Sequence, residues 1–435
     1  MLTAFASAFR TPDLRKKLVF TLAMIGLYRL GASLPTPNTN SVAINACIKS
    51  ASGTSQTAYA LINLFSGGAL LKLSVFALGI TPYITASIIV QLLVVVIPRF
   101  ETLKKEGQSG QQKLTQYSRY LTIGLAILQS SGFIALARSG QLFAGATDCH
   151  PLYRQSIFAM GTMVVIMTAG TGVVMWLGEL ITDRGVGNGM SILMFTSIAA
   201  RIPNEGQTIL HSAGGFAFTL ILLLGLAIIA AVVFVEQAQR RIPVQYAKRM
   251  IGRRMYGGSS TYLPLKVNMA GVIPVIFASS LLYIPQLISQ LNGNSTSGLQ
   301  LWVTNHLINQ QDWVHITTYF LLIIFFTYFY VGITFNPEER ADDMKKYGGF
   351  IPGIRPGRPT SEYLQYVLSR ITLPGALYLG IIAVLPNFFF SMTGGNNQNF
   401  PFGGTAVLIM VGVALDTVKQ IESQLMQRNY EGFLR

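Results

Sequence analysis

Apolar segments long enough to cross a lipid bilayer constrain this chain more than any other feature of its sequence. A helix needs about 20 mostly apolar residues to span the hydrocarbon core. Segments 220–235, 319–335 and 407–415, taken with their flanks, provide such lengths. Only 11% of the 435 residues are charged, against about 25% in soluble domains. The sequence therefore indicates a helical membrane protein rather than the two soluble domains that its length alone would suggest.

The hydropathy pattern predicts ten membrane spans. The first span follows a basic start and could be a signal peptide if it stood alone, but many further spans follow it. The fifth span is short for a bilayer, and short spans often mark functional sites in channels and transporters. The predicted spans are 16–34, 74–97, 118–138, 155–178, 188–202, 216–238, 268–290, 315–335, 367–390 and 403–424.

The positions of the basic residues predict the orientation of the chain. If the N-terminus lies in the cytoplasm, alternating spans place all but six of the 32 Lys and Arg residues on the inner side, as the positive-inside rule expects. An even number of spans also returns the C-terminus to the cytoplasm. Two inner loops, 239–267 and 336–366, are longer than minimal turns. Their charge could serve orientation alone, or it could also bind a large acidic partner.

The sequence lacks the motifs of several functional classes. The two cysteines and four histidines do not have metal-ligand spacing, and no phosphate-binding loop occurs. We therefore expect no metal, no cofactor and no enzymatic activity. A secondary transporter of a small solute remains an alternative, and it would need acidic residues near the membrane midplane. Glu179, Glu236 and Asp416 instead lie near predicted cytoplasmic ends of spans.

The outer segment 35–73 is polar at first and becomes apolar from Ala58 to Leu73. Its apolar part is too short to span the bilayer. Irregular backbone at membrane depth must be buried in protein or line a cavity. The sequence therefore leaves two interpretations open, a re-entrant segment or a surface turn before the second span.

Long motifs are spread over nearly the whole chain. They are Asn63-Leu-Phe-Ser-Gly-Gly-Ala-Leu70, Phe76-Ala-Leu-Gly-Ile-Thr-Pro-Tyr-Ile-Thr-Ala-Ser-Ile-Ile-Val-Gln91, Lys104-Lys-Glu-Gly107, Trp176-Leu-Gly-Glu179, Arg184-Gly-Val-Gly-Asn-Gly189, Leu263-Pro-Leu-Lys-Val-Asn-Met-Ala-Gly-Val-Ile-Pro274, Phe335-Asn-Pro337 and Pro352-Gly-Ile-Arg-Pro-Gly357. In sequence and in order, these motifs resemble the bacterial form of the SecY family of protein-conducting channels.

This resemblance implies an all-α membrane protein of ten transmembrane helices. Two pseudo-symmetric inverted-repeat halves, 1–202 and 203–435, would form a clamshell around a central pore. The pore would pass unfolded secretory polypeptides across a bacterial inner (plasma) membrane. A lateral gate between the second and seventh spans would release membrane segments into lipid. The implied partners are the small subunits SecE and SecG, the SecA motor ATPase, the ribosome and signal sequences.

The resemblance also implies two structures along the pore. An apolar ring would resist ions by dewetting, and its aligned positions are Ile80, Ile84, Met190, Met194, Ile276 and Ile409. The segment at about 61–72 would be a plug that blocks the outer funnel at rest. Its motif residues are Asn63, Leu64, Phe65, Ser66, Gly67, Gly68, Ala69 and Leu70.

Further residues are assigned to the gate, the loops and a possible crosslink. Polar residues on the spans near the gate could form a hydrogen-bonded latch or ordinary interhelical bonds, and these are Gln91, Gln129 and Asn268. The residues that match partner-binding positions of the family are Arg253, Arg254 and Arg355. Two cysteines of the outer loops, Cys47 and Cys149, could form a disulfide or remain unpaired thiols.

Overall fold

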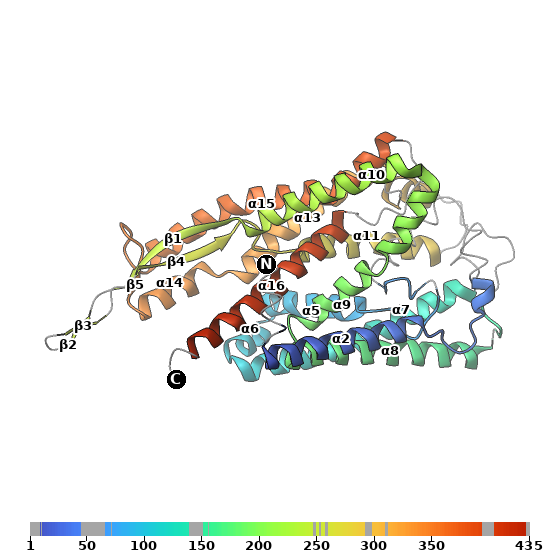
Figure 1. Ribbon diagram of the computed structural model, residues 1–435, viewed down its shortest axis with the longest axis horizontal. Helices are drawn as coiled ribbons and strands as arrows, with labels where there is room; N and C mark the ends of the chain where they lie inside the picture. Colours follow the sequence, from blue (N-terminus) through green and yellow to red (C-terminus); the bar gives the residue numbers. More distant parts are fainter. Residues whose placement is uncertain are drawn as a thin grey trace.

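Apolar helices that run mostly along the long axis of the molecule make up most of the structure (Figure 1). The computed structural model describes residues 9, 11–44, 66–70, 72–138, 151–154, 156–246, 249–251, 254–256, 260–291, 298–308, 312–393 and 404–431. The helices are α2 (Pro12–Ser33), α5 (Thr81–Val96), α6 (Pro98–Lys105), α7 (Gln108–Arg138), α8 (Ile157–Arg184), α9 (Gly189–Ala199), α10 (Ile202–Gln237), α11 (Ile273–Leu291), α12 (Gly298–Trp302), the π-helical η2 (Val303–Ile308), α13 (Trp313–Thr334), α14 (Pro337–Lys346), α15 (Arg358–Thr393) and α16 (Gly404–Glu431).

Each of the ten predicted spans contains a helix within the described residues. By length and composition, α7, α8, α13, α15 and α16 can each cross a membrane, and the bent pair α5–α6 can add a sixth span. Three further apolar helical segments are shorter, and they are α9, the second part of α10 and the first part of α11. The first predicted span is α2, which has basic residues near its start.

The second predicted span begins later than expected. Residues 74–80 form turns, and α5 begins only at Thr81. Gly79 has a φ of +55°, a left-handed conformation that favours glycine, and Pro82 lies in the first turn of the helix, where proline is well tolerated. Pro98 then begins α6 directly after α5, and the two helices are bent by 101°.

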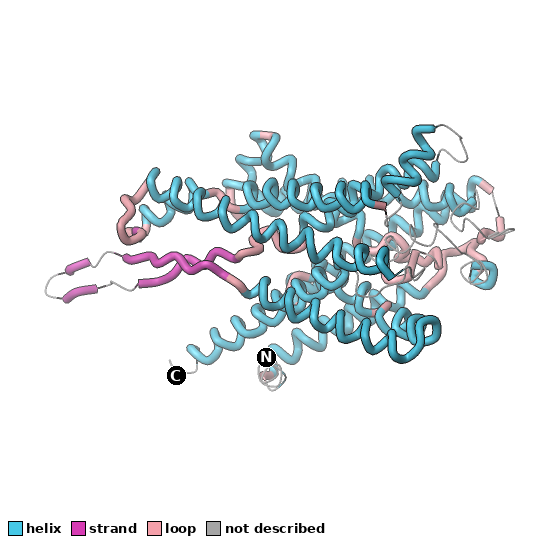
Figure 2. The backbone as a smooth tube through the Cα atoms, turned by 90° about the horizontal axis from the view of Figure 1, so that it is seen from above, coloured by secondary structure: helices cyan, strands magenta, loops and turns pink. Residues whose placement is uncertain are grey.

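The predicted loop 239–267 folds into a hairpin of two strands, which the sequence analysis did not predict (Figure 2). Strands β1 (Gln239–Tyr246) and β4 (Ser260–Lys266) pair antiparallel, with Gln239 opposite Lys266. The short strands β2 (Arg249–Ile251) and β3 (Arg254–Tyr256) pair with each other. The alternation of buried and exposed residues explains why this segment forms strand β1. Ile242 and Val244 are buried, while their neighbours are exposed, as side chains on the two faces of a strand should be.

The second predicted inner loop, 336–366, is joined to this hairpin. Strand β5 (Gly349–Phe350) pairs with β1, so that one sheet has the strand order β4-β1-β5. A hydrophobic cluster beneath it combines residues from the hairpin, α13 and α15, including Ile242, Leu265, Phe335 and Leu364. The topology predicted from the sequence places this sheet in the cytoplasm, so we call the sheet with this cluster the cytoplasmic platform.

Packing is concentrated within each half of the chain. The most extensive helix contacts in the first half are α5 with α7, α7 with α8 and α8 with α9. In the second half they are α13 with α15 and α11 with α13. Among element pairs in substantial contact within the described residues, α9 with α16 is the pair that joins the two halves.

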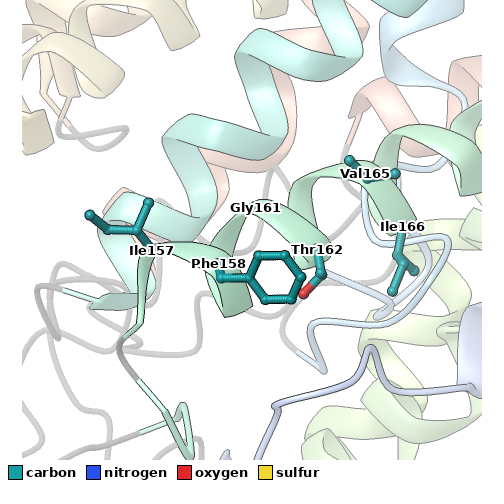
Figure 3. Close-up of a pocket in the computed structure, with 6 residues that line it drawn as sticks. All are labelled: Ile157, Phe158, Gly161, Thr162, Val165 and Ile166. Atoms are coloured by element: carbon teal, nitrogen blue, oxygen red, sulfur yellow. The ribbon is translucent and has the colours of Figure 1, made fainter.

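The outer surface of the bundle is apolar. Along α8, a shallow apolar depression is lined by Ile157, Phe158 and Val165 with their neighbours, all from this one helix (Figure 3). Phe158 is 82% exposed. Exposed apolar side chains of this kind indicate contact with membrane or protein, and lipid suits a helix of this length and hydropathy.

Candidate functional site

A cavity of about 450 Å³ lies where helices from both halves of the chain meet. Its walls come from α5, α7, α8 and α9 of the first half, and from α11 and α16 of the second half. One part of the wall is polar, with Gln91, Thr115, Arg119, Glu179 and Asp183. Another part is apolar, with Ile84, Ile88, Met190, Met194, Val272, Ile276, Ile409 and Val413. The cavity between the two halves is therefore lined by apolar and polar side chains together.

The six residues assigned to the apolar ring belong to one hydrophobic cluster. Ile80, Met194, Ile276 and Ile409 are buried, while Ile84 and Met190 are partly buried. Five of them also line the cavity, all except Ile80. Ile80 caps α5, and its carbonyl accepts a hydrogen bond from the Ile84 amide at 3.1 Å. The structure therefore brings together side chains that lie more than 300 residues apart in the sequence.

A side-chain cap and a close helix contact position the two methionines. The Asn188 carboxamide oxygen accepts hydrogen bonds from the Met190 and Ser191 amides at 3.1 and 3.4 Å, and so begins α9. The Gly189 amide donates to the Thr182 hydroxyl at 2.9 Å, and that hydroxyl donates to the Gly178 carbonyl at 2.9 Å. This short polar chain holds the start of α9 against α8.

The described part of the plug segment, Ser66–Leu70, is packed inside the protein. Gly67 and Gly68 have φ angles of +64° and +89°, which residues other than glycine rarely adopt. A Cβ added at Gly67 would lie 3.1 Å from the Ser197 backbone on α9 and 3.3 Å from a guanidinium nitrogen of Arg29 on α2. Leu70 is 1% exposed. This burial favours the re-entrant interpretation over a surface turn. Asn63, Leu64 and Phe65 lie outside the described residues.

The three polar residues assigned to the gate have different surroundings in this structure. Gln91 is exposed to the cavity and Gln129 is half-buried on α7. Asn268 is buried, and its amide nitrogen donates to Glu236 Oε1 at 2.6 Å and to the Gly271 carbonyl at 3.1 Å. No hydrogen bond among the described residues links Gln91, Gln129 and Asn268. The reason is that Asn268 lies at the base of the β1–β4 hairpin, before α11 begins.

The remaining assigned residues are only partly described. Arg355 is exposed in the turn before α15, next to the cytoplasmic platform. Arg254 begins β3. Arg253, Cys47 and Cys149 lie outside the described residues. Within the described part of the chain, no group of three or more His, Cys, Asp or Glu residues could hold a metal ion.

An ion pair on the cavity wall was not singled out from the sequence. Arg119 on α7 contacts Glu179 on α8 through two bonds, Nε to Oε1 at 2.8 Å and Nη2 to Oε2 at 2.9 Å. Its third nitrogen donates to the Gln116 carboxamide oxygen at 2.9 Å. In the sequence, the pair was visible only as a basic residue, Arg119, and an acidic residue, Glu179, near neighbouring ends of two predicted spans. The bidentate geometry fixes α7 against α8 at the cavity wall.

We expect the Arg119–Glu179 pair to stabilise the fold modestly. The two side chains remain 40% and 22% exposed, so a coupling energy of roughly 0.5–1 kcal/mol is expected, as for partly solvated pairs. A double-mutant cycle with Arg119→Gln and Glu179→Gln, measured by unfolding in detergent, gives this energy directly. The exposed pair Lys105–Glu101 is the control, and it should couple more weakly. Equal coupling in both cycles would contradict the expectation.

The fold and the cavity define a class, that of multi-pass helical membrane channels. A family model described as SecY matches residues 74–418. The chain is 66% identical over 442 residues to a protein from Mycobacterium bovis, and 64% identical over 440 residues to one from Streptomyces coelicolor. Both relatives are named Protein translocase subunit SecY, and both alignments cover 100% of each chain. The chain therefore belongs to the SecY family.

Solved structures agree on the fold. One described as a protein-conducting channel has a TM-score of 0.63 at 18% identity. The match covers 94% of this chain and 91% of the chain in that structure. Sec61 from a canine ribosome-channel complex has a TM-score of 0.59 at 17% identity, with coverages of 94% and 91%. The family consists of channel subunits, which confirms that the chain is not an enzyme. The solute-transporter alternative is not supported.

Proposed function

We propose that this chain forms the pore through which a translocase passes unfolded polypeptides across the membrane. The observation that carries the proposal is the apolar ring, in which residues from α5, α9, α11 and α16 of both halves meet in one cluster and line the cavity between the halves. A narrow apolar constriction resists ions because water enters it poorly. It also suits any polypeptide sequence, because apolar contact is non-directional.

The plug and the gate follow from the same arrangement. The buried Ser66–Leu70 segment would close the pore at rest and leave when a chain enters. Helices α5 and α11 both line the cavity, and the two halves, 1–202 and 203–435, share substantial helix packing at α9 and α16. We infer that the halves open at the seam between α5 and α11, so that an apolar signal sequence reaches lipid sideways.

The cytoplasmic platform is the proposed docking surface for partners. It combines basic residues of the hairpin with the exposed Arg355, and guanidinium groups suit phosphate and carboxylate contacts. The ribosome-bound Sec61 neighbour supports a ribosome as one partner, and the motor SecA is a second. We place the termini and the platform in the cytoplasm of a bacterial cell, with SecE and SecG as membrane partners.

Photocrosslinking tests the proposed pore directly. A photoreactive residue at Ile84 should crosslink to a stalled secretory chain when SecA and ATP are supplied, because Ile84 lines the cavity. The same probe at Phe158, which is 82% exposed on the outer face of α8, is the matched control. It should not crosslink to the middle of the secretory polypeptide. Crosslinks at Phe158 without crosslinks at Ile84 would refute the proposed path.

A further inference from the structure

Two buried polar atoms stand out because they lack hydrogen-bond partners. Among the buried side-chain nitrogen and oxygen atoms of the described residues, they are Asn268 Oδ1 and the Tyr378 hydroxyl. Buried polar groups are nearly always paired, because an unpaired one loses its contacts with water without replacement. Two such atoms therefore need a reason.

Both residues meet at Glu236. Asn268 donates to the Glu236 carboxylate at 2.6 Å, and the Tyr378 hydroxyl lies within electrostatic reach of that carboxylate. Gly375 lies one turn before Tyr378 on the same face of α15. A Cβ at Gly375 would collide with the Val267 carbonyl and lie 3.8 Å from the Asn268 Cα atom. The α15 helix therefore presents Tyr378 beside the Asn268 segment.

This polar group lies between the cytoplasmic platform and the cavity. Glu236 is in the last turn of α10, directly before β1, and Asn268 directly follows β4. The Val267 amide donates to the Ala238 carbonyl at 3.0 Å and closes the base of the hairpin. The Gly271 carbonyl accepts the second Asn268 bond. Residues directly after it, Val272, Ile273 and Ile276, line the cavity.

The backbone at Gly271 can turn at this place. Gly271 has a φ of +61° directly before α11, and a Cβ there would meet no atom within 4 Å. Glycine adopts this conformation without the strain of other residues. Helix α11 can therefore change direction relative to the hairpin base, and Asn268 is the side chain that ties the two together.

We propose that Glu236, Asn268 and Tyr378 form a positioning switch that gains a hydrogen bond when α11 moves. In the resting channel, the Asn268 amide nitrogen is bound to Glu236, and the Asn268 oxygen is unused. When α11 moves, the Tyr378 hydroxyl donates to that oxygen, so the open arrangement gains a bond that the resting one lacks. Three residues that neither line the cavity nor touch the polypeptide then set how often the channel opens. This inference rests on the proposed function.

The variant Tyr378→Phe tests the switch, because it removes only the unused hydroxyl. The full chain, reconstituted with its membrane partners in a planar bilayer, would be exposed to a synthetic signal peptide while ion conductance is recorded. We expect openings to fall roughly threefold to tenfold, as for the loss of one hydrogen bond. The melting temperature should stay unchanged or rise, because the resting structure loses no bond.

Tyr366→Phe is the matched control, since Tyr366 is exposed on the same helix. It should change neither openings nor melting temperature. A purely structural role for Tyr378 would lower the melting temperature, and this outcome would overturn the switch. Normal openings in Tyr378→Phe would overturn it as well. A wild-type channel that ignores the peptide would instead refute the proposed function, and the switch with it.

A second variant, Glu236→Gln, keeps the acceptor for Asn268 and adds an amide donor for its unused oxygen. The resting arrangement then has both bonds, so we expect fewer openings without loss of the folded channel. Adding Tyr378→Phe to this variant should reduce openings little further, because both changes act on the same hydrogen bond. Fully additive effects would overturn the gain of this bond.

Discussion

Replacing Met194 by asparagine is expected to make the resting channel conduct ions. Met194 is buried in the apolar ring and lines the cavity. A carboxamide without a partner in an apolar environment costs roughly 2–7 kcal/mol, and water entering the constriction relieves this cost. Because about 1.4 kcal/mol corresponds to about tenfold in an equilibrium, the leak should rise by at least about tenfold. Conductance of the reconstituted channel without substrate is the measurement.

The control for this prediction is Met194→Leu, which keeps the volume and the apolar character of the side chain. It should leave the resting conductance near that of the wild type. A second comparison, Ser191→Asn, places the same carboxamide one turn earlier, at a position that is already polar and lines the cavity. If Met194→Asn conducts no more than Ser191→Asn, the ring does not form the ion barrier.

The largest loss of stability is expected from Gly189→Ala. A Cβ at Gly189 would overlap the backbone carbonyl of Gly178, and backbone atoms cannot turn aside as a side chain can. The overlap would push α9 away from α8 and break the bond from the Gly189 amide to the Thr182 hydroxyl. We expect a loss of about 3 kcal/mol, the upper part of the range for overpacked sites. Unfolding in detergent measures it.

Two glycines of α8 serve as graded controls for this variant of α9. A Cβ at Gly178 would meet mainly the Met190 side chain, which is flexible and can move, so Gly178→Ala should cost less than Gly189→Ala. A Cβ at Gly172 would meet nothing within 4 Å. Gly172→Ala should be neutral or stabilising by up to about 1 kcal/mol, from helix propensity. Equal losses in all three variants would contradict the steric explanation.

The helical part of the fold could be predicted from the sequence because membrane spans obey simple rules. Long apolar segments must become helices in lipid, since each backbone polar group needs a partner within the segment. All ten predicted spans contain helices for this reason. The start of the second span was placed too early because hydropathy does not register the turns at Gly79.

Other features depend on contacts that no local pattern reveals. The β1–β5 pairing joins segments about 100 residues apart. Within the loop 239–267, the alternation of Ile242 and Val244 with less apolar neighbours is a strand signal that a search for membrane spans does not use. The sequence left two roles open for Asn268, a latch at the gate or an ordinary interhelical hydrogen bond, and its partner Glu236 lies across the base of a hairpin that the sequence did not suggest. The apolar ring came from family resemblance, because apolar residues spaced by four occur on most membrane helices.

The contact between α9 and α16 has a consequence for biosynthesis. The first half packs mainly against itself, so it can assemble while the ribosome is still making the second half, as domains generally do. Helix α16 is made after the other described helices, and it supplies Ile409 and Val413 to the cavity wall. Until it is inserted, the nascent protein lacks this part of the wall. Premature termination before residue 404 would therefore leave a first half able to pack, but an apolar ring without Ile409.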